Sequence, residues 1–265
     1  MGGGTSTRTR VTLARVVAVA LALVATLLLM GLIDLFTLVG WVDQDFEWEV
    51  PLEASWGSLF TFFLAGGYVW VALFPRAAWP GLVQLGICAL ALTVSAAAGA
   101  DGRPLWLALG VAASAILLWL VVGRPALTLG PPSMHRAALA VAAVGVPLWL
   151  PYLLAAFAAS RAGELGSITQ GIEHWPVQGA VGMVLVLGAL VLASWSDGRA
   201  LLRVAVSLTA VYIGMAELAY PDRAGAMGSV PWGVGVTLWG LLVALVVVPA
   251  RGPDERRLRH GMSHQ

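Results

Sequence analysis

Eight runs of 17 to 23 residues, nearly free of charged side chains, fill most of this 265-residue chain. A helix rises about 1.5 Å per residue, so such runs can cross a hydrocarbon core of roughly 30 Å, with little chain left for other structure. The sequence therefore predicts an all-α, polytopic integral membrane protein, built as a bundle of eight transmembrane helices.

The composition supports the same class of protein. The chain is 59% hydrophobic and 11% charged, whereas soluble domains carry roughly 25% charged residues. A water-soluble protein with a single core is therefore excluded. The net charge of +1 gives no support for nucleic-acid binding, and the single cysteine, Cys88, cannot form an internal disulfide.

The expected spans are bounded by charged or turn-forming residues, with ends uncertain by roughly two to four residues. A short basic N-terminus, residues 1–15, precedes them, and a basic tail, residues 251–265, follows. The transmembrane domain is expected to cover residues 16–250, with an acidic loop at residues 39–55. The eight spans are 16–38, 56–74, 80–100, 105–123, 137–159, 176–195, 204–220 and 231–250.

Arginine falls mainly on alternate connections between the spans. Cytoplasmic loops of membrane proteins carry an excess of basic residues, so this asymmetry predicts that both termini are cytoplasmic. One side holds Arg8, Arg10, Arg15, Arg76, Arg124, Arg136, Arg199, Arg203, Arg251, Arg256, Arg257 and Arg259, and the other holds Arg103, Arg161 and Arg223.

The first span is expected to stay in the protein as a signal anchor. It exceeds the usual apolar region of about 7 to 15 residues in a signal peptide, and no small-residue cleavage site follows it. Lysine and asparagine, whose codons are AT-rich, are both absent from the chain. This suggests a GC-rich bacterial genome, and hence a multi-pass protein of the bacterial inner (plasma) membrane.

Strong catalytic and cofactor motifs are absent from the chain, including H-E-x-x-H, G-x-x-x-x-G-K-[ST], G-x-S-x-G and C-x-x-C. We therefore expect no cofactor, no metal site and no ATP hydrolysis by this chain alone. The remaining candidates are polar residues at membrane depth, where lipid cannot solvate them.

Glu217 is the sharpest candidate for a functional ionisable group. It follows Arg203 by 14 residues, which places it roughly 21 Å along the seventh span, inside the hydrocarbon. Ser207, Ala210 and Gly214 precede it on one helical stripe of small residues that is expected to pack against other helices. Glu217 could be a proton- or cation-linked group, or it could make a structural hydrogen bond.

Asp34 and His174 are weaker candidates for functional ionisable groups. Asp34 lies 19 residues beyond Arg15, roughly 28 Å along the first span, so it is expected at the outer interface. His174 stands next to Glu173, just before the sixth span, and could titrate near neutral pH. A loop histidine without a spaced partner is more often neither a switch nor a metal ligand.

The loop at residues 39–55 alternates acidic with mostly apolar residues between Val42 and Val50. A period of two fits a short strand or a cap, with the carboxylates along one edge. The glycine and final glutamate of an EF-hand are missing, so a calcium loop is the less favoured alternative.

Several residues are candidates to line a polar cavity. Pro147 and Pro151 should kink or partly unwind the fifth span, because each removes a backbone donor, and Tyr152 follows them. Gln84 in the third span and Gln178 in the sixth could face the same cavity or simply pack between helices.

Three functions from different classes fit these features. The favoured one is a transporter or permease-like subunit with an outward-facing polar cavity. The alternatives are a membrane-embedded enzyme acting on a lipid or lipid-linked substrate at the outer face, and a non-catalytic assembly or sensing subunit of a membrane complex. The expected partners are the lipid bilayer and, in a transport complex, a second membrane subunit or an ATPase.

Overall fold

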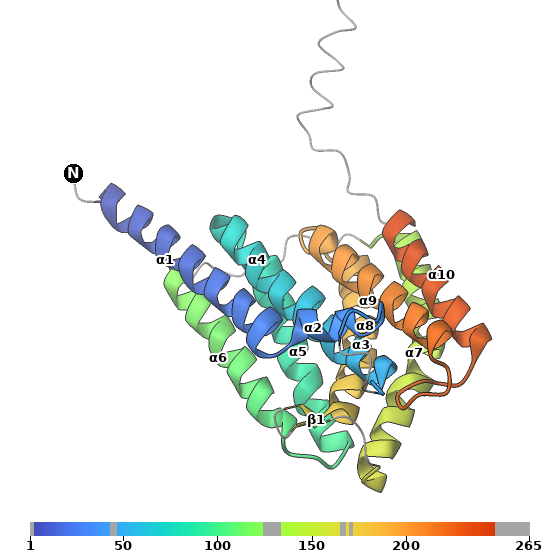
Figure 1. The fold of residues 1–265 in the computed structure, drawn as a ribbon. Coiled ribbons are helices and arrows are strands. Elements are labelled where there is room, and N and C mark those ends of the chain that lie inside the picture. Colours follow the sequence, from blue (N-terminus) through green and yellow to red (C-terminus); the bar gives the residue numbers. More distant parts are fainter. Residues whose placement is uncertain (1–2, 43–46, 124–133, 165–167, 170–171, 247–265) are drawn as a thin grey trace, which may run out of the picture.

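The computed structural model describes residues 3–42, 47–123, 134–164, 168–169 and 172–246, which form a bundle of helices (Figure 1). Seven helical segments are long and apolar enough to cross a membrane. An eighth apolar helix, α10 (Val230–Val246), has 17 residues in the described part of the chain. Its expected end at residue 250, like the tail at 251–265, lies outside the described residues.

The first span is broken near its end. α1 (Gly3–Leu23) continues as a π-helix, η1 (Val24–Leu28), and a short helix, α2 (Gly31–Phe36), then follows. Met30 between them has a positive φ of 57°, a conformation that costs energy for a residue with a side chain. The expectation of one continuous helix over 16–38 is therefore wrong, because the chain turns at Met30.

The second span begins six residues before the expected residue 56. α3 (Val50–Ser58) has Pro51 in its first turn, where proline has no hydrogen bond to lose, and continues through the π-helix η2 (Leu59–Ala65) into α4 (Gly66–Leu73). Glu53, which the sequence assigned to the acidic loop, therefore lies within a helix and is buried. Of the predicted strand or cap in that loop, residues 43–46 lie outside the described part.

The remaining helices lie within a few residues of their expected ranges, except that α9 begins five residues early. A pair of two-residue antiparallel strands precedes α8, and apart from this small hairpin the regular structure of the described residues is helical. The elements are η3 (Pro75–Ala77), α5 (Trp79–Ala98), α6 (Pro104–Val122), α7 (Arg136–Ala162), β1 (Ile168–Thr169), β2 (Ile172–Glu173), α8 (His174–Ser194) and α9 (Arg199–Ala219).

α7 contains both predicted helix-disturbing prolines, Pro147 and Pro151, yet it stays α-helical over its whole length. Of the two predicted alternatives, a kink or partial unwinding, the unwinding does not occur there. π-helical turns occur instead in the first two spans, on either side of the α2–α3 contact.

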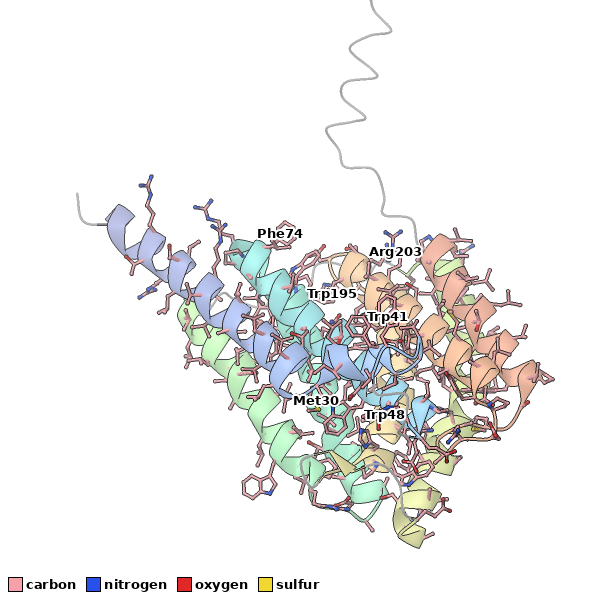
Figure 2. All side chains as sticks on the ribbon, in the orientation of Figure 1. Met30, Trp41, Trp48, Phe74, Trp195 and Arg203 are labelled. Carbon is pink, nitrogen blue, oxygen red and sulfur yellow. The ribbon has the colours of Figure 1, made fainter. Side chains whose placement is uncertain are left out.

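α8 is the central helix of the bundle. It packs against α3, α5, α7 and α9, whereas α1 and α6 lie at one side and expose many apolar side chains. Exposed leucine and valine side chains suit a lipid-facing helix, because lipid is as apolar as they are. Figure 2 shows Phe74, Trp195 and Arg203 toward the end of the bundle where α1 starts, while Met30 and Trp48 lie farther from that end.

Candidate functional site

Three titratable side chains converge inside the bundle. Asp34 of α2, Glu53 of α3 and His174 at the start of α8 are each at most 3% exposed. One potential ligand atom from each lies within 4.8 Å of the other two. The His174 Nε2 and Glu53 Oε2 atoms are 3.4 Å apart. We call these three residues the acidic–histidine cluster.

Two glycines allow α2 and α3 to approach each other closely enough to form this cluster. A Cβ atom on Gly57 would lie 2.8 Å from the Gly31 carbonyl oxygen and 2.9 Å from Leu35 Cδ2. A Cβ atom on Gly31 would lie 2.6 Å from Phe60 Cβ. Larger residues at either position would therefore move Asp34 away from Glu53.

Irregular backbone flanks the acidic–histidine cluster on both chain segments that carry its acids. The π-helix η1 and the left-handed residue Met30 come just before Asp34, and the π-helix η2 follows the helix that carries Glu53. η1 and η2 also contact each other. π-helical turns are rare and are often found at functional sites.

Trp56 covers one side of the acidic–histidine cluster. Its ring centroid lies 4.7 Å from that of His174, and it stacks on Phe60 at the same centroid distance. The Trp56 indole N–H donates a hydrogen bond of 2.8 Å to the Leu29 carbonyl, next to Met30. Trp56 is itself buried, so it forms a fixed wall between the cluster and the side of the bundle where Phe60 lies.

The polar atoms of the acidic–histidine cluster are incompletely satisfied. Among the described residues, Asp34 Oδ2 is buried and has no hydrogen-bond partner. The charged groups that act on Asp34 are Glu53 and His174, both members of the cluster. An unpaired buried carboxylate is expensive, so this arrangement favours binding of a proton or a cation.

Glu217 lies elsewhere, at the end of α9. Its Oε2 atom accepts a hydrogen bond of 2.7 Å from the backbone N–H of Met227, and its Oε1 atom accepts one of 2.8 Å from that of Ser229. The small-residue stripe before it packs on α10, where a Cβ on Gly214 would lie 2.8 Å from the Gly233 carbonyl oxygen. Glu217 thus holds the α9–α10 connection in place.

The two glutamines also bind backbone groups. Gln178 donates from Nε2 to the Gly225 carbonyl at 2.9 Å, in the same α9–α10 connection. Gln84 donates from Nε2 to the Phe63 carbonyl at 2.7 Å, within η2. A π-helix shifts the register of its hydrogen bonds, and the Gln84 amide supplies a donor there.

Tyr152 packs in a group of aromatic rings between α7 and α10. It stacks on Trp232, with ring centroids 5.3 Å apart, and meets the edge of Trp149 at 5.5 Å. The Trp232 indole donates a hydrogen bond to the Leu148 carbonyl of α7, between Pro147 and Pro151 in the chain. The Trp239 indole donates one to the Val141 carbonyl, six residues before Pro147. Side chains therefore fill the space beside this part of α7.

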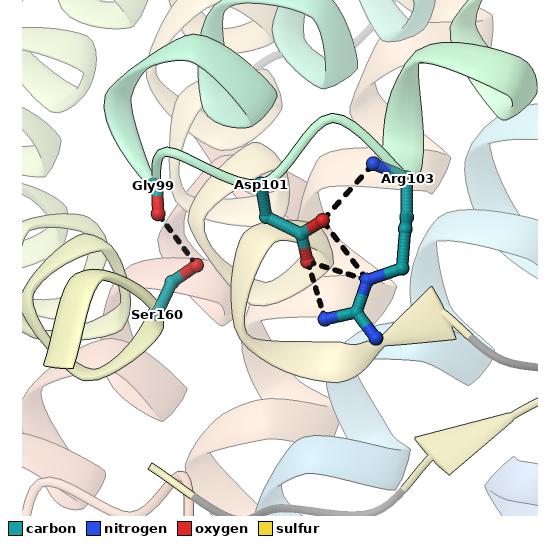
Figure 3. Close-up of polar contacts among 4 residues, drawn as sticks. All are labelled: Gly99, Asp101, Arg103 and Ser160. Atoms are coloured by element: carbon teal, nitrogen blue, oxygen red, sulfur yellow. Dashed lines mark hydrogen bonds and ion pairs between the residues drawn. The ribbon is translucent and has the colours of Figure 1, made fainter. Parts of the chain in front are cut away.

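A polar depression lies at the end of α5. Asp101 there forms a bidentate ion pair with Arg103, in which the Arg103 Nη2 and Asp101 Oδ2 atoms are 2.8 Å apart (Figure 3). Nearby, Ser160 donates a hydrogen bond to the Gly99 carbonyl. The depression, about 300 Å³, is lined by Asp101, Arg103 and Trp175 among others. Partial burial would raise the pKa of Asp101, but the hydrogen bonds and charge of Arg103 lower it below its usual value.

The sequence predicted Asp34 and His174 as separate candidates and did not predict Glu53. The structure brings the three side chains together. The signal for Glu53 was Pro51 two residues earlier. A proline after the acidic loop marks a helix start, and would have moved Glu53 into the second span.

The comparisons with known proteins give no relative. This chain matches no protein-family model, and neither a curated protein nor a solved structure is similar to it.

Proposed function

We propose that this multi-pass membrane protein transports a small cation, and that the acidic–histidine cluster is its binding site. The observation that carries this proposal is the convergence of Asp34, Glu53 and His174 in a buried place where the Asp34 Oδ2 atom has no partner among the described residues. Ionisable groups inside membrane bundles mark ion pathways and proton relays more often than they stabilise the fold.

Enclosure of the cluster favours a small ion over a larger substrate. His174 is 0% exposed and Glu53 is 2% exposed, and the Trp56 ring packs on His174. A proton or a dehydrated metal ion can enter such a place after a small displacement of α2. A lipid head group could not enter without separating α2, α3 and α8.

The irregular helices supply elements that could move. A change of φ at Met30, together with a return of η1 or η2 to regular α-helix, would shift Asp34 relative to Glu53. Transport proteins commonly place ion sites at interrupted helices, where the backbone has two accessible arrangements.

Further buried polar groups lie in η2 and in α3, α5 and α9, which each contact η2. Ser58 follows Glu53 by five residues along the same segment, roughly 7.5 Å of helix, and its hydroxyl is buried without a hydrogen-bond partner among the described residues. The hydroxyl of Thr61, the carbonyl oxygen of the Gln84 amide and the hydroxyl of Thr209 are in the same condition. These groups could receive an ion that leaves the cluster.

Flux into proteoliposomes tests the proposal. Purified protein is reconstituted with an internal dye for protons or divalent metals, and uptake is followed after an ion gradient is applied. Wild type should transport, Glu53→Gln should not, and Asp101→Asn, which alters a carboxylate outside the cluster, should behave as wild type. Absence of flux for protons, alkali ions and divalent metals in wild type, or full flux in Glu53→Gln, would reject transport.

We also propose that both termini face the cytoplasm, which the distribution of arginine supports. In a Cys88→Ala background, single cysteines are introduced at Gly102, between the third and fourth spans, and at Asp197, between the sixth and seventh. Both residues are exposed, and their connections are expected on opposite sides of the membrane. A membrane-impermeant thiol reagent should label the first in intact cells and leave the second unlabelled. The opposite pattern would invert the orientation.

A second candidate function is a membrane-embedded enzyme acting on lipid, and one cavity favours it. The cavity holds about 230 Å³ and is lined mainly by apolar side chains of α1, η1, η2 and α6, including Leu29 and Phe60. Both residues contact Trp56, which also packs on His174 of the acidic–histidine cluster. If an acyl chain binds there for catalysis, wild type should convert membrane lipid to a product detectable by mass spectrometry, and Glu53→Gln should not.

A further inference from the structure

We infer that the acidic–histidine cluster is a binding site for a divalent transition-metal ion of the Zn²⁺ type, with one carboxylate oxygen of Asp34, one of Glu53 and the Nε2 atom of His174 as ligands. The inference names the cation of the site on which the proposed transport function rests. No sequence motif of the chain predicts this metal site, because the three ligands come from three separate helices.

The spacing of the ligand atoms fits such an ion. Bonds of about 2.0–2.2 Å from Zn²⁺ to imidazole nitrogen and carboxylate oxygen place neighbouring tetrahedral ligands roughly 3.4 Å apart. The His174 Nε2 and Glu53 Oε2 atoms already lie 3.4 Å apart. With every ligand pair within 4.8 Å, the Asp34 carboxylate needs to move inward by no more than about 1.5 Å to complete the set.

The Asp34 Oδ2 atom has no hydrogen bond to lose in that adjustment. It is buried and has no hydrogen-bond partner among the described residues. The hydrogen bond of 2.6 Å that Thr37 donates goes to the backbone carbonyl of Asp34, not to the carboxylate, so it fixes the turn that carries the side chain. A buried carboxylate oxygen that lacks a donor is suited to bind a metal ion.

The chemical nature of the ligands selects among divalent ions. One imidazole and two carboxylates suit Zn²⁺ and the neighbouring ions Mn²⁺, Fe²⁺ and Co²⁺. Ca²⁺ takes six to eight oxygen ligands, and Mg²⁺ needs near-octahedral oxygen coordination. The His174 nitrogen and the small number of oxygens disfavour both of these ions.

Charge points the same way. Two ionised carboxylates with a neutral imidazole leave two uncompensated negative charges in a buried place, and a divalent ion cancels them. Among the described residues, Arg103 pairs with Asp101 and Arg223 pairs with Glu47, and both of these pairs lie outside the cluster. Three protein ligands also leave a fourth position of a tetrahedral ion for water, as in zinc sites that exchange ligands.

Metal binding to the full-length protein in detergent tests the inference. Protein purified without a histidine tag is stripped with a chelator and titrated with Zn²⁺ against a fluorescent zinc indicator. His260→Ala and His264→Ala are introduced throughout, because these two tail histidines could bind metal themselves. We expect one ion per chain, with Mn²⁺ and Co²⁺ competing and Ca²⁺ and Mg²⁺ failing to compete.

Substitution of each ligand supplies the decisive comparison. Glu53→Gln, Asp34→Asn and His174→Gln should each weaken Zn²⁺ binding by roughly 100-fold or more, since changes even to residues that only orient metal ligands cost 10- to 100-fold. His135→Gln is the matched control. His135 accepts a hydrogen bond from the Ala138 backbone N–H at the start of α7 and does not belong to the cluster.

The results separate this inference from transport. Zn²⁺ affinity that is unchanged in the three ligand variants would overturn the metal site, as would the absence of any binding to wild type. Thermal melting of each variant without metal shows whether it is folded, and a variant that melts as wild type does yet binds no Zn²⁺ supports the site. Metal binding without flux in proteoliposomes would reject transport and keep the metal site, whereas Glu53-dependent proton flux without metal binding would do the reverse.

Discussion

Two buried carboxylates, those of Glu217 and Glu53, stand in helices next to each other and are satisfied in different ways. Both oxygens of Glu217 accept hydrogen bonds from backbone N–H groups, at 2.7 and 2.8 Å. Glu53 instead faces His174 and Asp34, two groups that can themselves change charge. The Glu217 site is complete within the chain, whereas the acidic–histidine cluster needs a proton or a cation to become neutral.

The difference teaches that burial of an acid does not by itself indicate function. Backbone donors are fixed in number and cannot dissociate, so a carboxylate bound to them is part of the fold. A carboxylate that faces other ionisable groups has its charge compensated by a proton or a cation, and either of these can dissociate. The partners of a buried acid therefore separate a structural from a functional role better than its depth in the membrane does.

The largest effect is expected from matched glutamine substitutions at these two positions. Glu217→Gln places an amide N–H against a backbone N–H of Met227 or Ser229, and leaving one such donor without an acceptor costs about 1–3 kcal/mol. Glu53→Gln removes one negative charge from a cluster with two carboxylates, and should leave the thermal stability equal to or higher than that of wild type. Thermal melting in detergent without added metal measures both.

The comparison fails if the two variants lose equal stability. In that case Glu53 would also be a structural acceptor, and the acidic–histidine cluster would be a hydrogen-bonded network of the fold.

A comparable loss of stability is expected from Gly57→Ala. The added methyl group would lie 2.8 Å from the Gly31 carbonyl oxygen, and overpacking of this kind costs about 1–3 kcal/mol. Because it separates α2 from α3, it should also weaken Zn²⁺ binding without changing any ligand. Gly86→Ala is the control, since Gly86 is in the middle of α5 with open space where its Cβ would lie. Unchanged metal binding in Gly57→Ala would mean that close packing of α2 on α3 does not position Asp34.

Hydropathy could predict the helices of this fold, because the length of an apolar run decides whether it can span a membrane. Seven of the eight expected spans correspond to helices of sufficient length, and the eighth is an apolar helix. Helix starts and breaks were harder to predict. The turn at Met30 follows from packing of Gly31 against Phe60, a contact between distant residues that no local pattern in the first span encodes.

The candidate site was predictable only in part. Asp34 and His174 were recognisable as polar residues next to apolar runs, but their meeting depends on how α2, α3 and α8 pack. Depth along the helix suggested that Glu217 was the more interesting acid. Depth along the helix does not predict the path of the α9–α10 connection. This connection folds back and brings the backbone N–H groups of Met227 and Ser229 to the Glu217 carboxylate.

An effect of about 1 kcal/mol is expected for Trp56→Phe. The phenyl ring preserves stacking on Phe60 and contact with His174, but the hydrogen bond from the indole N–H to the Leu29 carbonyl is lost. Loss of this bond should loosen the turn before α2 and speed the exchange of bound metal, while the affinity changes little. Stopped-flow chelation of Zn²⁺-loaded protein measures the rate. An unchanged rate would show that Trp56 does not restrain access to the acidic–histidine cluster.

The smallest effect concerns a third kind of carboxylate, Asp101, which is satisfied by an arginine at the surface. Partial burial favours its neutral form, but hydrogen bonds and charge from Arg103 outweigh burial and lower its pKa. A lowered folded-state pKa contributes stability that is present above the unfolded value of about 3.9 and is lost as the pH falls through the folded pKa. Since Arg103 is 46% exposed, the pair should contribute no more than about 1 kcal/mol, and less at high salt. Asp101→Asn should therefore melt slightly below wild type near neutral pH. The difference should shrink as the pH falls below about 3.9 and vanish well below the lowered folded-state pKa. A difference that persists in acid would mean that the carboxylate stabilises the α5–α6 connection through its shape and not through its charge.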